Sequence, residues 1–143
     1  MSGARLVSIA ATTALAVMFG AVGAASAQVI DPARSAIANS ARLDAGATAV
    51  HLEGVVYCAT CQRFTLGATV SQAGSGAVGQ GGVRCVCHGA REHWLVTARA
   101  REATRFKPGD ARVCIWIIAR GNGGKAIDAR QWCEHVTLRL AEA

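Results

Sequence analysis

Methionine and proline are scarce in this sequence of 143 residues, and each occurs only twice. The two methionines are Met1 and Met18, so the chain after position 18 offers no thioether to a metal. That absence removes the usual axial ligand of a blue-copper site. Aromatic residues make up only 5% of the sequence.

Lysine is nearly as rare, because Lys107 and Lys125 are the only two among 15 basic residues. An excess of Arg and Ala over Lys is typical of bacterial genes rich in G and C. The formal net charge of +6 supports solubility and attraction to anions. It falls short of a nucleic-acid signature, in which basic residues cluster beside stacking aromatic side chains, so we expect no nucleic-acid partner.

Familiar enzyme motifs are missing as well. The sequence contains no HExxH, no GxSxG and no phosphate-binding GxxxxGK[ST], and its four histidines, at 51, 88, 93 and 135, stand singly. Covalent haem requires CxxCH, whereas the CxxC of this chain is followed by Gln62. We therefore predict no catalytic residue, no cofactor and no enzymatic activity.

The beginning of the chain has the pattern of a secretory signal. Arg5 precedes an uncharged run from Leu6 to Val22, and small residues at Ala25 and Ala27 complete a cleavage site. The run is shorter than the roughly 20 residues of a membrane-spanning helix. We expect residues 1–27 to be removed and the mature protein to begin at Gln28, to be periplasmic or secreted, and to have no membrane span.

The remainder divides into two parts. Residues 28–47 are rich in alanine and are expected to form a tail or a short helix, which Asp31 and Pro32 would begin. Residues 48–143 form the predicted β domain, because β-branched and aromatic residues occur there in short runs separated by glycine.

Six strands are predicted in this domain. The predicted ranges are Ala49–Tyr57, Phe64–Val70, Val83–Cys87, Trp94–Arg101, Arg112–Ala119 and Trp132–Leu140. The range Val113–Ile118 is apolar on both faces, which predicts a central strand. The glycine-rich segment 71–82 is expected to be a mobile loop. The fold class is therefore all-β: a small, disulfide-stapled antiparallel β-sandwich or barrel.

An even number of cysteines, six, is typical of a disulfide framework in an exported protein. One pairing follows from arithmetic. If Gly123 and Gly124 are the centre of a two-residue hairpin, facing residues have numbers that add up to 247, as those of Cys114 and Cys133 do. These two cysteines are then directly opposite and within reach of a disulfide.

The other four cysteines form a CxxC at Cys58 and Cys61 and a CxC at Cys85 and Cys87. We expect them to be paired among themselves in structural disulfides. An alternative is a site in which all four thiolates bind Zn or Cu. A third reading, a CxxC redox protein, would normally require a helix that starts at the motif, and no helical pattern is visible there.

Arginines supply the candidate ligand surface. Alternation along the strands places Arg99 and Arg101 on one polar face, and Arg139 with His135 on the polar face of another strand. Guanidinium groups favour carboxylate, sulfate or phosphate. The expected partners are anionic envelope polysaccharide, lipid head groups or another envelope protein, unless the arginines only solubilise the surface.

Residues Glu53–Cys61 contain the pattern G-x-V-Y-C-x-T-C, and Leu66–Val70 follow shortly after. This part of the sequence resembles the opening of the plant pollen-allergen and extensin family typified by the major olive-pollen allergen. The sequence departs from that family at Ala59 and Gln62, and no cysteine follows Val70. The resemblance implies a secreted β-rich domain held by three disulfides, and no activity. Taken together, the sequence predicts an exported, non-enzymatic binding or structural module of the bacterial envelope.

Overall fold

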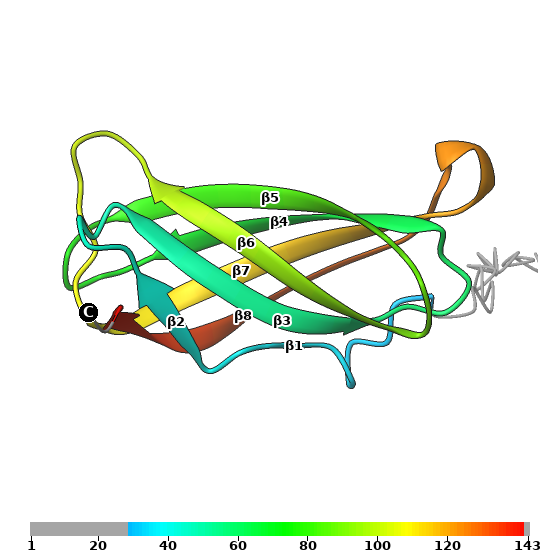
Figure 1. The fold of residues 1–143 in the computed structure, drawn as a ribbon, viewed down its shortest axis with the longest axis horizontal. Coiled ribbons are helices and arrows are strands. Elements are labelled where there is room, and N and C mark those ends of the chain that lie inside the picture. The colour runs from blue at the N-terminus through cyan, green and yellow to red at the C-terminus, as the bar shows by residue number, and fades with distance from the viewer. Residues whose placement is uncertain (1–28, 142–143) are drawn as a thin grey trace, which may run out of the picture.

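The computed structural model describes residues 29–141 (Figure 1). The predicted signal segment 1–27 and Gln28 lie outside the described residues. In chain order the elements are β1 (Ala36–Ile37), β2 (Ser40–Leu43), β3 (Ala49–Tyr57), β4 (Arg63–Ser71), β5 (Val78–Val86), β6 (Arg91–Ala100), β7 (Gly109–Arg120), the 3-10 turn η1 (Asn122–Gly124) and β8 (Ala126–Leu140). The prediction of an all-β fold is confirmed.

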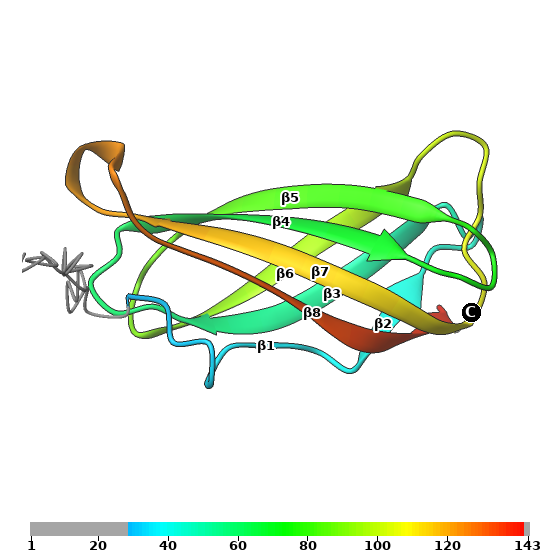
Figure 2. The same ribbon diagram turned by 180° about the vertical axis from the view of Figure 1, so that it is seen from behind.

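Seven strands close into a barrel in the order β3, β2, β8, β7, β4, β5, β6 and back to β3. Strands β3 and β6 pair over nine positions and cross the front of the barrel in Figure 1. Figure 2 shows β7 and β8 on the opposite side. Strand β2 completes the barrel by pairing in parallel with β8, over only four positions. Strand β1 lies beyond β2 on the same edge of β3.

Alternation builds the core of the barrel. On β6, Trp94, Val96 and Ala98 are buried, whereas Leu95 and Arg99 are exposed. Strand β7 follows the same alternation, with its interior positions between 111 and 119 buried. It lies between β8 and β4, as predicted for a central strand. Within residues 29–141 no second layer covers the barrel, so the apolar residues on the outer face of β7 are not all buried.

The N-terminal segment corrects the expectation of a tail or short helix over residues 28–47. Asp31 accepts a hydrogen bond from the Ala33 amide at 3.0 Å, but only one turn follows. Residues 36–37 and 40–43 form β1 and β2 instead, and Ile37 and Leu43 enter the core. Burial of these side chains, together with backbone pairing to β3, outweighs the weak helix propensity of the segment.

The expected mobile loop over residues 71–82 is also corrected, because residues 78–82 belong to β5. Glycine is required here because neighbouring atoms lie too close to β5 for a side chain. A Cβ atom at Gly81 would lie 2.1 Å from the carbonyl oxygen of Thr97, and one at Gly79 would lie 2.9 Å from the Phe106 ring. The glycines therefore allow β5 to lie against its neighbours, a known use of glycine inside strands.

The β7–β8 hairpin has the predicted register but a different turn. Cys114 faces Cys133, and their sulfur atoms are bonded, with the Cα atoms 4.0 Å apart. The turn is not the predicted two-residue turn. It spans Gly121–Lys125, where the Gly121 amide donates to the Lys125 carbonyl at 2.9 Å. The pairing of β7 with β8 shifts register between Ala119 and Arg120, just before this turn.

Candidate functional site

A cluster of cysteines lies at one end of the barrel. Cys58 follows β3, and its sulfur lies within 4.8 Å of those of Cys61 and Cys87, which form a disulfide with Cα atoms 6.2 Å apart. Cys58 is buried and Cys85 is partly buried, and both are thiols. The expectation that all four would be paired is therefore corrected. Cys58 directly follows β3, whereas Cys85 belongs to β5. Strand β6 lies between these two strands in the sheet.

This chemistry bears on both alternatives for the cysteines. A disulfide sulfur offers no thiolate to a metal, so the oxidised protein presents two thiols instead of the four that a thiolate site requires. The redox alternative places reactivity in the CxxC, but there Cys58 is a thiol while Cys61 is bonded to Cys87. Among residues 29–141, moreover, the only helix is η1, far from Cys58 in sequence.

Burial raises the pKa of the Cys58 thiol to about 11, and Glu92 adds a smaller effect in the same direction. Burial likewise raises the pKa of Cys85. Because the thiolate is the nucleophile, both cysteines should react slowly with alkylating reagents near neutral pH.

We predict that two thiols per chain react with iodoacetamide in denaturant without reductant, and that Cys58 of the folded protein reacts far more slowly at pH 8. The rate at Cys58 should rise about tenfold per pH unit toward pH 11, as the thiolate fraction grows. Mass spectrometry of alkylated peptides provides the measurement. Recovery of no reactive thiol in denaturant would show that Cys58 and Cys85 are bonded.

The structure separates the predicted arginine surface into parts. Arg99 lies on β6 and Arg101 just after it, whereas Arg139 lies on β8. Strands β2 and β3 lie between β6 and β8 on one side, and β7, β4 and β5 lie between them on the other. His135 faces Arg112 of β7. The four predicted residues therefore do not form one continuous row.

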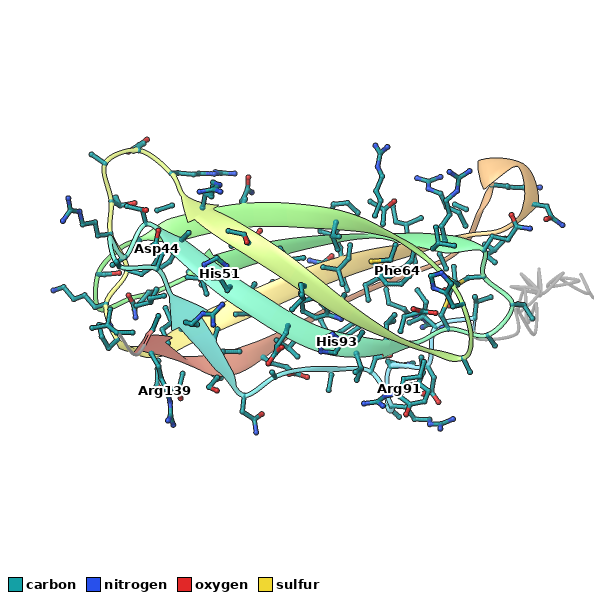
Figure 3. All side chains as sticks on the ribbon, viewed as in Figure 1. Asp44, His51, Phe64, Arg91, His93 and Arg139 are labelled. Atoms are coloured by element: carbon teal, nitrogen blue, oxygen red, sulfur yellow. A yellow bond between two sulfur atoms is a disulfide. The ribbon has the colours of Figure 1, made fainter. Side chains whose placement is uncertain are left out.

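Arg139 instead lies beside an arginine that the alternation of the predicted strands did not indicate. It pairs with Arg42 in the parallel β2–β8 ladder, and Arg42 pairs with His51 of β3 on its other side. Neighbouring strands are about 4.8 Å apart, so the three basic side chains form one row across three strands. Figure 3 shows His51 and Arg139 in the half of the barrel nearer the C-terminus.

This row lines a groove of about 270 Å³ on the outer surface, to which Glu53 and Leu95 also contribute. The His51 Nδ1 atom lies 3.1 Å from Thr97 Oγ1. Like charges directly opposite one another on a sheet are destabilising. Within the described part of the chain, neither Arg42 nor Arg139 forms an ion pair with an acidic side chain. The groove therefore has uncompensated positive charge.

Two carboxylates, Asp44 and Glu92, accept hydrogen bonds from backbone amides. Hydrogen bonds from the Ala49 and Thr48 amides lower the pKa of Asp44, and those from His88 and Gly89 lower the pKa of Glu92. Both acids are thus fixed in backbone turns, and among residues 29–141 neither forms an ion pair with Arg42 or Arg139.

Two histidine–carboxylate pairs occur on the surface. His88 and Glu92 lie 3.7 Å apart, and His93 and Glu53 lie 3.8 Å apart. The imidazole side chains are 78% and 59% exposed, so neither pair sits in an enclosed site that excludes water. Open pairs of this kind lack the preorganised surroundings on which acid–base catalysis depends.

The fold and the groove define a small disulfide-bonded β-barrel with a basic outer surface. No protein-family model and no curated protein sequence matches the chain. Residues 29–141 contain no helix of sufficient length and apolar character to span a membrane.

Two solved structures show a limited likeness to this chain. One is AggA, the major subunit of aggregative adherence fimbriae type I from Escherichia coli, with 8% identity over 75% of this chain and 94% of that one and a TM-score of 0.37. The other is the CooA pilin subunit of enterotoxigenic Escherichia coli, with 11% identity over 73% and 91% and a TM-score of 0.35. At these TM-scores the likeness carries no argument about function.

Proposed function

We propose that this protein is an exported, non-enzymatic binding module of the bacterial envelope that binds anionic groups in the groove between β2, β3 and β8. The observation that carries the proposal is the row of Arg139, Arg42 and His51 across three neighbouring strands. Within residues 29–141, no acidic side chain forms an ion pair with Arg42 or Arg139.

The chemistry of the row determines the ligand class. Arginine presents paired N–H donors that match carboxylate, sulfate and phosphate groups. In the tautomer whose Nδ1 accepts a hydrogen bond from the Thr97 hydroxyl, the His51 ring carries its N–H on Nε2 and adds that donor to the row. Glu53 lies on the groove wall and disfavours anions placed next to it, so we place the anionic group over Arg42 and Arg139.

The proposal can be tested by retention on immobilised dextran sulfate. We expect Arg42→Ala/Arg139→Ala to bind several-fold more weakly than the wild type and to elute at lower salt, because screened surface charges act over only about 8 Å at physiological ionic strength. The matched control is Arg99→Ala/Arg101→Ala, which removes the same charge elsewhere on the barrel.

The control should elute closer to the wild type than the groove variant does. Equal elution of the two double variants would mean that net charge alone determines retention, and the groove would then have no specific role. Vesicles of phosphatidylglycerol, used in place of the resin, test whether lipid head groups supply the same anionic chemistry.

A further inference from the structure

Trp116 is the one aromatic side chain among the exposed large apolar residues of the described chain, at 44% exposure. It lies on the outer face of β7 and pairs with Gly67 of β4. A Cβ atom at Gly67 would come within 2.3 Å of three indole atoms, so the ring lies across the glycine backbone. Gly67 in turn pairs with Gly82 of β5. Gly67 thus provides a flat bed for the indole on the outside of the barrel, and Gly82 adds no side chain to the surface beside it.

Arginines lie next to this bed on the same outer face. Arg84 of β5 pairs with Thr65 of β4, and Arg63 of β4 pairs with Arg120 of β7. A hollow of about 260 Å³ beside Trp116 is lined by Thr65 and Arg84, among others. A second hollow, of about 320 Å³, also contains Thr65 and Arg84 and extends to Arg63 and Arg120. The two hollows therefore form one track from the indole to the arginines.

The arginines of this track lack a countercharge. Arg63 and Arg120 are directly opposite, an arrangement that costs stability unless an anion lies between or beside them. The ion pairs within residues 29–141 involve none of the three arginines. The Arg120 Nη1 atom donates to the Gly124 carbonyl at 3.1 Å, which fixes this guanidinium at the edge of the track.

We propose that the track formed by Trp116, Thr65, Arg63, Arg84 and Arg120 binds an acidic polysaccharide, with a pyranose ring against the indole and its carboxylates or sulfates on the arginines. The apolar C–H face of a sugar ring packs against an aromatic surface, and the Thr65 hydroxyl can hydrogen-bond to sugar hydroxyl groups. Charged acidic groups along the polymer then meet the paired donors of arginine.

Single-stranded nucleic acid fits the track less well. Such ligands bind where several aromatic side chains stack successive bases. Here Phe64, Phe106 and Trp94 are buried, Trp132 packs against the core, and the Arg34 guanidinium covers the Tyr57 ring. Trp116 is therefore the one exposed aromatic platform among residues 29–141. This site uses different strands and residues from the β2–β3–β8 groove and does not depend on it.

The test compares binding of polygalacturonate, inorganic polyphosphate and neutral dextran to the folded protein by fluorescence titration or calorimetry. We expect Trp116→Ala to weaken polygalacturonate binding about tenfold while leaving polyphosphate binding within about twofold. Trp116→Phe should retain most of the affinity. Arg63→Ala/Arg84→Ala should weaken the binding of both polyanions.

Arg99→Ala/Arg101→Ala, which removes two positive charges that line neither the track nor the groove, serves as the matched control and should bind polygalacturonate like the wild type. Unchanged urea unfolding of each variant checks that the barrel is intact. The proposal is overturned if Trp116→Ala binds polygalacturonate as the wild type does, or if it loses affinity for polyphosphate to the same extent. A failure confined to the groove variant on dextran sulfate would concern the proposed function alone.

Discussion

Replacing Gly54 by alanine is expected to destabilise the barrel by about 3 kcal/mol, at the upper end for overpacking of a core. Gly54 lies on β3 opposite Trp94 of β6. A Cβ atom there would lie 2.3 Å from the carbonyl oxygen of Ala36 and 2.4 Å from the Trp94 ring. Trp94 is 1% exposed and the carbonyl belongs to the backbone, so neither can move without disturbing β1 or the core.

Gly67→Ala is the matched control. Its Cβ atom would approach Trp116 as closely, at 2.2 Å, but that ring is exposed and can swing away from the sheet. We expect a loss of about 1 kcal/mol or less in the free energy of unfolding, since a flexible surface side chain relieves the overlap. Urea unfolding followed by circular dichroism measures both variants. Equal losses would mean that the close approach in the core is no more restrictive than the one on the surface.

Removal of the Cys114–Cys133 disulfide, in the variant Cys114→Ala/Cys133→Ala, is expected to lower the free energy of unfolding by about 3 kcal/mol. The two residues are 19 positions apart and join β7 to β8. Without the bond the unfolded chain gains conformational freedom, so the dependence of unfolding on urea should also become steeper.

Cys58→Ala/Cys85→Ala is the control for this experiment, because it removes two cysteines and no disulfide. Its loss should come from packing at the buried Cys58 and should leave the urea dependence unchanged. A Cys114→Ala/Cys133→Ala variant that is as stable as this control would contradict a stabilising role for the bond.

The success of the Cys114–Cys133 prediction shows which information the sequence holds locally. Register along a hairpin is set by a short connection, so numbering alone places the two cysteines opposite one another. The turn itself was predicted wrongly, because the actual connection is longer. The register shift after Ala119 offsets the difference: Ala119 faces Asp128, and the sum of 247 is restored from there to the cysteines.

Strands with strong alternation could likewise be predicted. Ala49–Tyr57 coincides with β3, and the predicted Arg112–Ala119 lies within β7. Strand β2, which carries Arg42, could not be predicted, because its few apolar residues show no clear period and its partner, β8, is distant in sequence. The basic groove therefore depends on a long-range parallel pairing that leaves no local signal.

Trp116 shows a different limit. The apolar residues on both faces of β7 correctly indicated a central strand, and burial of both faces is the usual reason for that pattern. In a barrel of one layer the outer face meets solvent, so the same pattern left an indole on the surface, over Gly67 of β4. The sequence of the strand is the same whether its outer face is buried or exposed. The outer face is exposed here because the sheet closes into a barrel.

The four-residue parallel ladder between β2 and β8 has a consequence for synthesis. Leu43 pairs with Leu140, so the barrel can close only after the chain has been synthesised as far as residue 140. Until then the edges of β2 and β8 are open to pairing with other chains, the state in which β proteins aggregate. Contacts between such distant segments also form slowly. A chain truncated before β8 should therefore remain dependent on chaperones, however well its other strands pair.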